Sequence, residues 1–129
     1  KRTYYNNYDL PYMDEFYNYN DLGYLTERIE RIKMTSTVYT YKHEYNEMGK
    51  LSAIRKISNK SETPVEEMEF SYDELGNLIE KLIYRNGTLK TNIQIIYNSK
   101  THLLESVITT EEATGFMMVC RYRDYQFFD

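Results

Sequence analysis

The fold is decided by the stretch Tyr72-Asp73-Glu74-Leu75-Gly76-Asn77-Leu78, because the same order of residues returns at nearly constant intervals. Two further copies are Tyr19-Asn20-Asp21-Leu22-Gly23-Tyr24-Leu25 and Tyr45-Asn46-Glu47-Met48-Gly49-Lys50-Leu51, and a fourth, Tyr97-Asn98-Ser99-Lys100-Thr101-His102-Leu103, lacks the glycine. The tyrosines at positions 19, 45, 72, 97 and 122 are separated by 26, 27, 25 and 25 residues. A repeat of this length predicts a chain built from one supersecondary unit used several times.

Each copy carries the residues of a β-hairpin turn. Asn or Asp in the second place accepts hydrogen bonds from the backbone that follows, and Gly supplies the left-handed position of a G1 bulge. Cross-strand pairs of an aromatic and an aliphatic residue stabilise a sheet by about 0.2–1 kcal/mol each. The turn geometry predicts four such pairs: Tyr19 with Leu25, Tyr45 with Leu51, Tyr72 with Leu78, and Tyr97 with Leu103.

Length and charge set limits on the class of protein. The 129 residues predict one folded domain, with residues 1–11 as an N-terminal arm or edge and residues 12–129 as a single β-hairpin repeat domain. The net charge of −4, with dispersed Lys and Arg, argues against a nucleic-acid partner. The lone Cys120 excludes an intramolecular disulfide. No apolar run approaches the ~18 residues of a membrane helix, and charges on both strand faces disfavour an integral membrane barrel.

The segments between the turns alternate in polarity like β-strands. Val38 to Tyr45 is the clearest example, and the Asn86-Gly87 pair predicts a two-residue type I′ turn. Leu25 to Lys33 also fits a helical period, but its place directly after a repeat turn favours a strand. The fold class expected is therefore all-β, an antiparallel meander of about nine strands that ends near Phe128.

Counting parity from the repeat tyrosines predicts one apolar face. Its members are Tyr17, Tyr19, Leu25, Ile29, Tyr39, Tyr41, Tyr45, Leu51, Ile57, Met68, Phe70, Tyr72, Leu78, Leu82, Tyr84, Ile93, Ile95, Tyr97, Leu103, Val107, Phe116, Met118, Cys120 and Tyr122. A sheet with one apolar face needs a cover, and the sequence offers no amphipathic helix. We therefore expect the sheet to curl into a half-barrel or open barrel, or to pack against another copy or domain.

The Tyr-[Asp/Asn]-x-x-Gly-x-Leu motif at this period resembles the YD repeats of the RHS family, over roughly Tyr12 to Tyr122. The resemblance implies tandem β-hairpins that wrap into a strip. In that family such strips form shells around toxic cargo or surface-exposed carbohydrate-binding segments, and the same turn is used by small β-rich envelope proteins of Bacteroidetes-type bacteria. It implies no catalytic residues, because the repeat itself carries none.

Few residues suggest chemistry. His43 and Cys120 are better explained as a hydrogen-bonded histidine and a small buried hydrophobe, since neither has the spacing of a metal site or a nucleophile pair. We expect no catalytic, metal or cofactor site. The surplus of tyrosine suits stacking on sugars or docking on a protein. The residues predicted to bind are Tyr4, Tyr5, Tyr8, Tyr12, Tyr39, Tyr41 and His43.

Two functions follow as hypotheses. The first is a non-enzymatic structural or interaction module in the periplasm or at the surface of a bacterium, which binds protein or glycan through an aromatic face or an open edge. The second is a carrier that encloses a lipid or another apolar ligand in the curled sheet. A hydrolase using paired carboxylates ranks behind both. Unpaired sheet edges also predict a homodimer, formed through an edge or through the apolar face.

Overall fold

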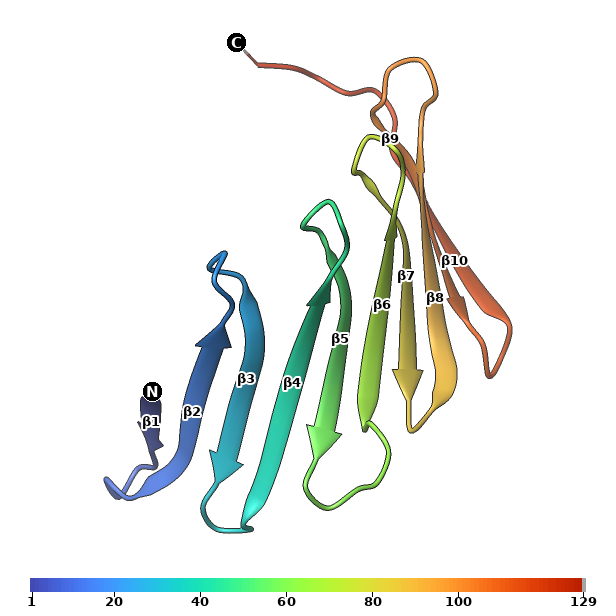
Figure 1. Cartoon of the computed structure of the whole chain (residues 1–129). Helices are drawn as coiled ribbons and strands as arrows, with labels where there is room; N and C mark the ends of the chain where they lie inside the picture. The colour runs from blue at the N-terminus through green and yellow to red at the C-terminus, as the bar shows by residue number, and fades with distance from the viewer. Residues whose placement is uncertain (129) are drawn as a thin grey trace.

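A computed structural model describes residues 1–128 and contains a single antiparallel sheet (Figure 1). Its strands follow one another in space in the order of the chain, from β1 at one edge to β10 at the other. The bounds are β1 Arg2–Tyr5, β2 Pro11–Tyr19, β3 Leu25–Ile32, β4 Thr37–Tyr45, β5 Leu51–Ser58, β6 Glu66–Tyr72, β7 Leu78–Arg85, β8 Thr88–Tyr97, β9 Leu104–Glu111 and β10 Phe116–Arg121.

The all-β prediction is confirmed: the chain forms an antiparallel meander that stays open, because β1 and β10 do not meet. Three details differ. The sheet has ten strands instead of nine, since residues 2–5 form an edge strand within the expected N-terminal segment. The helical alternative for Leu25 to Lys33 is wrong, because this segment is β3. The last strand ends at Arg121, well before Phe128, and residue 129 lies outside the described part of the predicted domain.

The repeat turns have the expected geometry. In the third copy the Asp73 N–H donates to the Asn77 carbonyl, the Gly76 N–H donates to the Asp73 carbonyl, and the Asp73 carboxylate accepts from the backbone of Leu75 and Asn77. Gly76 has φ +82°, which a residue with a side chain adopts only at a cost. Asn86 and Gly87 both have positive φ, as the predicted type I′ turn requires.

The fourth copy forms a longer turn than expected. The Asn98 N–H donates to the Leu103 carbonyl, and His102 takes the left-handed conformation, with φ +57°, that glycine takes in the other copies. Tyr97 consequently lies opposite Leu104, so its predicted pairing with Leu103 is wrong. The loop has one extra residue, and its left-handed residue His102 lies four positions after Asn98, whereas Gly76 lies three positions after Asp73.

An extra residue directly after each turn changes which face the later residues occupy. Each strand that follows a repeat turn carries a β-bulge. Tyr19, Tyr45, Tyr72 and Tyr97 each lie opposite a leucine, but the residue before each tyrosine pairs with the residue two positions after that leucine, so one residue is left between. A bulge of one residue reverses the side-chain alternation beyond it. Four residues assigned to the apolar face therefore lie on the other face: Ile29, Ile57, Leu82 and Tyr84. Ile54 and Ile83 replace them beside Met68.

Adjacent repeats are joined by a tyrosine hydroxyl that donates to a leucine carbonyl of the preceding repeat. Tyr45 Oη lies 2.8 Å from the Leu25 carbonyl oxygen. Tyr72 Oη lies 2.7 Å from that of Leu51, and Tyr97 Oη lies 3.0 Å from that of Leu78. Tyr125 makes the same contact with Leu104, so Tyr125 takes this role in place of the expected Tyr122. The repeat tyrosine therefore has a long-range partner as well as its cross-strand leucine.

The turns also touch one another. Tyr24, which lies between glycine and leucine in the first copy, stacks on Tyr45 with ring centroids 5.0 Å apart. A Cβ added to Gly49 would come 2.9 Å from its hydroxyl oxygen. Lys50 holds the same place in the second copy, and its Cε lies 3.4 Å from the Cβ position of Gly76. The residue after each of these glycines thus lies over the glycine of the next turn.

The sheet is a single layer without a packed interior. Ala53 is the one apolar residue among residues 1–128 that is buried. The accessible surface is 9,555 Å², whereas a compact monomer of 15.6 kDa exposes about 7,200 Å². The expected cover for the apolar face is not supplied by residues 1–128, so both faces meet solvent.

Candidate binding face

One face of the sheet carries most of the tyrosines, and we call it the tyrosine face. Over β1 to β5 its residues include Arg2, Tyr4, Met13, Glu15, Tyr17, Tyr19, Leu25, Arg28, Glu30, Ile32, Tyr39, Tyr41, His43, Tyr45, Leu51, Ile54 and Lys56. Over β6 to β10 they include Glu66, Met68, Phe70, Tyr72, Leu78, Lys81, Ile83, Thr91, Ile93, Ile95, Tyr97, Leu104, Val107, Thr109, Phe116, Met118 and Cys120. The first half alternates aromatic and charged groups, and the second is mainly apolar.

Glu15 is the centre of the charged half. Its side chain lies in β2 and is 4% exposed, which is a costly position for a carboxylate unless partners surround it. The hydroxyls of Tyr4 and Tyr17 both donate to Oε2 at 2.7 Å, and Arg28 lies 3.4 Å from Oε1. Three strands therefore supply the groups that satisfy this one carboxylate.

Arg28 extends the network to the next strands. Its guanidinium pairs with Glu30 at 3.1 Å and lies over the ring of Tyr41, 4.1 Å from the centroid. Tyr41 donates its hydroxyl to Glu30, and Lys56 Nζ lies 4.4 Å from the ring centre of Tyr39 and 5.3 Å from that of Tyr41. Cations over aromatic faces are attracted by about 0.5–1 kcal/mol at exposed sites.

These contacts shift the ionisation of the groups involved. The tyrosine hydroxyls that donate to Glu15, first Tyr4 and then Tyr17, hold the pKa of that carboxyl below its usual value. The same bonds raise the pKa of both phenols, since losing the proton would break a bond and place two negative charges together. Burial raises the pKa of Tyr41. The face therefore keeps Glu15 ionised and these tyrosines protonated at neutral pH.

The structure divides the predicted binding residues into two groups. Tyr4, Tyr39, Tyr41 and His43 share the tyrosine face, and Glu15 and Arg28 connect Tyr4 with Tyr41. The other three lie at the β1–β2 hairpin: Tyr5, Tyr8 and Tyr12, with exposed fractions of 60%, 84% and 37%. The ring centroids of Tyr4 and Tyr12 are 6.3 Å apart. His43 places Nδ1 3.2 Å from the Tyr41 carbonyl oxygen, as expected for a hydrogen-bonded histidine.

Sequence reasoning missed the charged members of this face. Glu15, Arg28, Glu30 and Lys56 were not predicted to lie beside the tyrosines. The bulge after Leu25 places Arg28 and Glu30 on the tyrosine face, whereas simple parity puts them on the other. A cross-strand charge rule would not have found them, because Glu15 lies directly opposite the like-charged Glu30 and Arg28 lies opposite Tyr17 and Tyr41.

The other face has its own charged cluster. Asp14, the neighbour of Glu15 in β2, points to the opposite side, where it accepts from Thr3 at 2.7 Å and lies 3.4 Å from Lys1 and 3.5 Å from Lys33. The hydrogen bond from Thr3 is the main cause that lowers the pKa of Asp14. Asp14 and Glu15, which are consecutive in β2, therefore link the first three strands on the two opposite faces of the sheet.

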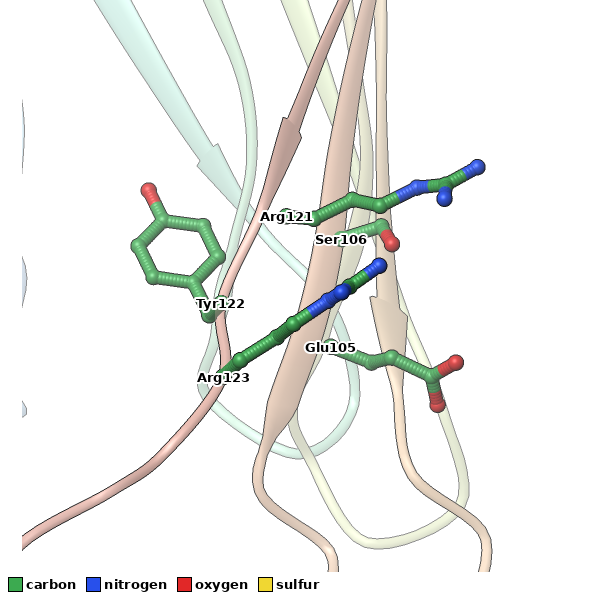
Figure 2. Close-up of a pocket in the computed structure, with 5 residues that line it drawn as sticks. All are labelled: Glu105, Ser106, Arg121, Tyr122 and Arg123. Atoms are coloured by element: carbon green, nitrogen blue, oxygen red, sulfur yellow. The ribbon is translucent and has the colours of Figure 1, made fainter.

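Two open cavities lie at the C-terminal end of the sheet. The larger, about 430 Å³, is lined by Glu105, Ser106, Arg121, Tyr122 and Arg123. Figure 2 shows Arg121 and Arg123 extending to one side together with Ser106 and Glu105, while Tyr122 extends to the other. A smaller cavity of about 220 Å³ lies beside it, near Leu104 and Tyr125. A lipid carrier needs an enclosed apolar chamber, and neither of these two cavities is enclosed.

Other predicted features have plain outcomes. Cys120 is exposed on β10, so its expected burial is wrong. Residues 1–128 contain no group of three or more His, Cys, Asp and Glu side chains able to hold a metal ion. Over the same residues, the structure has no helix of the length and apolarity needed to cross a membrane.

No protein-family model matches the chain, and no curated protein matches it significantly.

Proposed function

We propose that this chain is a non-enzymatic structural or interaction module that binds a protein or glycan through the tyrosine face and the open sheet edge. The observation that carries the proposal is the uncovered sheet: 11 of the 15 tyrosines lie in its strands, and its buried apolar content, among residues 1–128, is Ala53. Exposed aromatic and apolar surface of this kind marks interaction sites in soluble proteins.

The charged half of the tyrosine face supports binding more than it supports catalysis. Glu15 and Glu30 each pair with Arg28 and each accept a hydrogen bond from a tyrosine hydroxyl, so their carboxylate oxygens are already engaged by other groups of the face. The rings of Tyr39 and Tyr41 are held in place by Lys56 and Arg28. Rigid aromatic rings beside charged groups are suited to a sugar face or to a partner's polar surface.

A bacterial cell envelope or surface is the location we propose. Its support is the likeness of the Tyr-Asp-x-x-Gly-x-Leu motif to YD repeats. Fractionation of cells that produce the tagged full-length protein tests this location, and recovery in the cytoplasm alone would contradict it.

Binding is tested with Tyr39→Ala and a matched control, Tyr19→Ala. Tyr39 lies under Lys56 on the tyrosine face, whereas Tyr19 is 62% exposed and outside the charged network. On a glycan array, and in capture of proteins from an envelope extract, we expect a ligand retained by the wild type and by Tyr19→Ala but lost by Tyr39→Ala. The proposal fails if no ligand is retained in either assay, or if both variants bind equally.

A further inference from the structure

The outer strand β10 differs from every other strand because all six of its residues are exposed. The exposed fractions are 64% for Phe116, 58% for Met117, 51% for Met118 and 46% for Val119. Edge strands in soluble proteins are usually protected by charges, proline, bulges or a covering segment. Phe116 to Cys120 has no charge and no proline, and its register with β9 is regular. This edge is therefore open to another strand.

The outward backbone groups of β10 can be identified from its pairing. The Tyr122 N–H donates to the Glu105 carbonyl, so the even-numbered residues of the strand turn their backbone groups toward β9. In an antiparallel strand the intervening residues turn theirs the other way. Met117, Val119 and Arg121 thus direct N–H and C=O groups away from the sheet, where no strand of residues 1–128 pairs with them.

The opposite edge of the sheet is unlike this one. Strand β1 has four residues, and its side chains are tied to β2: Thr3 bonds Asp14, Tyr4 bonds Glu15, and Arg2 lies 5.9 Å from the ring centre of Tyr17. Lys1 stands beside it. A short, positively charged strand suits neither a long partner strand nor the Arg121 end of β10. Head-to-tail growth through β1 is therefore disfavoured.

We propose that β10 pairs antiparallel with β10 of a second copy of this chain, with Met118 opposite its counterpart on the two-fold axis. The β10 pairing rests on the proposed function only in that both use the open edge of the sheet. Met117 then lies opposite Val119, Phe116 lies opposite Cys120, and Arg121 lies beyond the apolar segment opposite Gly115. Every residue from 116 to 120 meets an apolar partner, and no two like charges face each other.

The pairing also joins the two aliphatic surfaces. Phe116, Met118 and Cys120 lie on the tyrosine face next to Thr109 and Val107 of β9. The two copies of these side chains would become neighbours on one continuous face. Backbone hydrogen bonds from Met117 and Val119 hold the two strands together, the matching of side chains sets the register, and the added apolar contact gives the association its main driving force.

Cysteine cross-linking tests the register. In the proposed pairing Met118 forms a non-hydrogen-bonded pair with Cα atoms about 4.5 Å apart, a separation that a disulfide spans. We expect Met118→Cys, made together with Cys120→Ser, to give a covalent dimer under mild oxidation. Native Cys120 lies opposite Phe116 and should give none. A Cys120-linked dimer in the wild type, or no dimer with Met118→Cys, would overturn the register.

Solution mass tests the edge itself. The wild type should change from 15.6 kDa to about twice that mass as concentration rises. Val119→Pro removes an N–H that points away from β9, so the variant should remain folded by circular dichroism and monomeric. Val119→Thr keeps that N–H and should dimerise. A monomeric wild type, or a dimeric Val119→Pro, contradicts the proposal but leaves ligand binding by the Tyr39 region intact. Lost ligand binding with normal dimerisation would instead reject the proposed function alone.

Discussion

At the scale of single residues, the repeat tyrosine performs two tasks. Its ring lies opposite the leucine of its own hairpin, and its hydroxyl donates to the leucine carbonyl of the preceding hairpin. The leucine opposite each repeat tyrosine thus pairs across the hairpin with that tyrosine and accepts, through its carbonyl, a hydrogen bond from the tyrosine of the next repeat. A tyrosine provides both interactions, whereas phenylalanine provides the first alone.

Replacing Tyr72 with phenylalanine tests this second task. We expect the free energy of unfolding to fall by about 0.5–1.5 kcal/mol, the net value of one hydrogen bond, in urea denaturation. Tyr19→Phe is the matched control, because Tyr19 belongs to the first repeat, has no preceding repeat leucine to bond, and is 62% exposed. Equal losses in the two variants would show that the hydroxyl contact does not link the repeats.

Alanine substitutions at two turn glycines should destabilise the fold by different amounts. Gly76→Ala should cost about 1 kcal/mol because φ is +82° there, while Lys50 leaves room for the added carbon. Gly49→Ala should cost more, since its Cβ would come 2.9 Å from the Tyr24 hydroxyl. Adding Tyr24→Phe should recover part of the Gly49→Ala loss in thermal melts. No recovery would place the whole cost in the backbone.

The ionisation of Glu15 makes stability depend on pH. Its folded pKa lies below the unfolded value of about 4.3, so its contribution is present above that pH and is lost as the pH falls through the lowered folded pKa. Urea midpoints measured from pH 7 to pH 3 should fall more steeply for the wild type than for Glu15→Gln. Parallel curves would mean that the Tyr4 and Tyr17 bonds do not stabilise the ionised form.

At the scale of secondary-structure elements, the turns were predictable because their residues act locally. Asn or Asp, Gly and Leu each meet a requirement within seven residues, and the strands between them follow. The turns include the G1 bulge that the glycine predicts, but the second bulge, directly after the paired leucine, was not predictable, since the extra residues Thr26, Ser52, Ile79 and Glu105 share no side-chain chemistry. One missed residue per hairpin was enough to assign Ile29 and Ile57 to the wrong face.

In the candidate site, the tyrosines could be selected from the sequence but their charged partners could not. Tyr4, Tyr39 and Tyr41 were recognised from tyrosine enrichment, which needs no register. Their charged partners Glu15 and Arg28 depend on the pairing of β2 with β3 beyond the bulge, and that pairing is set by contacts between distant residues.

Deleting a bulge residue tests how the hairpins set the faces. Without Ile79, β7 must either exchange the faces of its residues, with Leu82 moved to the tyrosine face and Ile83 moved away from it, or slip its register against β8. We expect a loss of about 1–3 kcal/mol in the free energy of unfolding. Deleting Glu62 from the loop between β5 and β6 removes a residue outside any strand and should change stability by at most about 0.5 kcal/mol. Comparable effects of the two deletions would contradict a structural role for the bulge.

At the scale of the whole molecule, the sheet is stabilised along its plane and not by a core. Hairpin turns, hydroxyl bonds between repeats, and charged clusters on both sides of β2 take the place of a second layer. Such a sheet exposes surface that a compact domain would bury, and the exposed surface is what the proposed binding and the β10 pairing both use.

Small-angle X-ray scattering tests the open single layer most directly, at concentrations where the mass is that of one 15.6 kDa chain. A compact domain of 129 residues has a radius of gyration of about 14 Å. An open ten-stranded layer predicts a radius clearly above that value, with a scattering profile that fits the sheet of Figure 1. A radius of about 14 Å with the profile of a globular particle would show that the sheet closes on itself, and would contradict the single-layer fold.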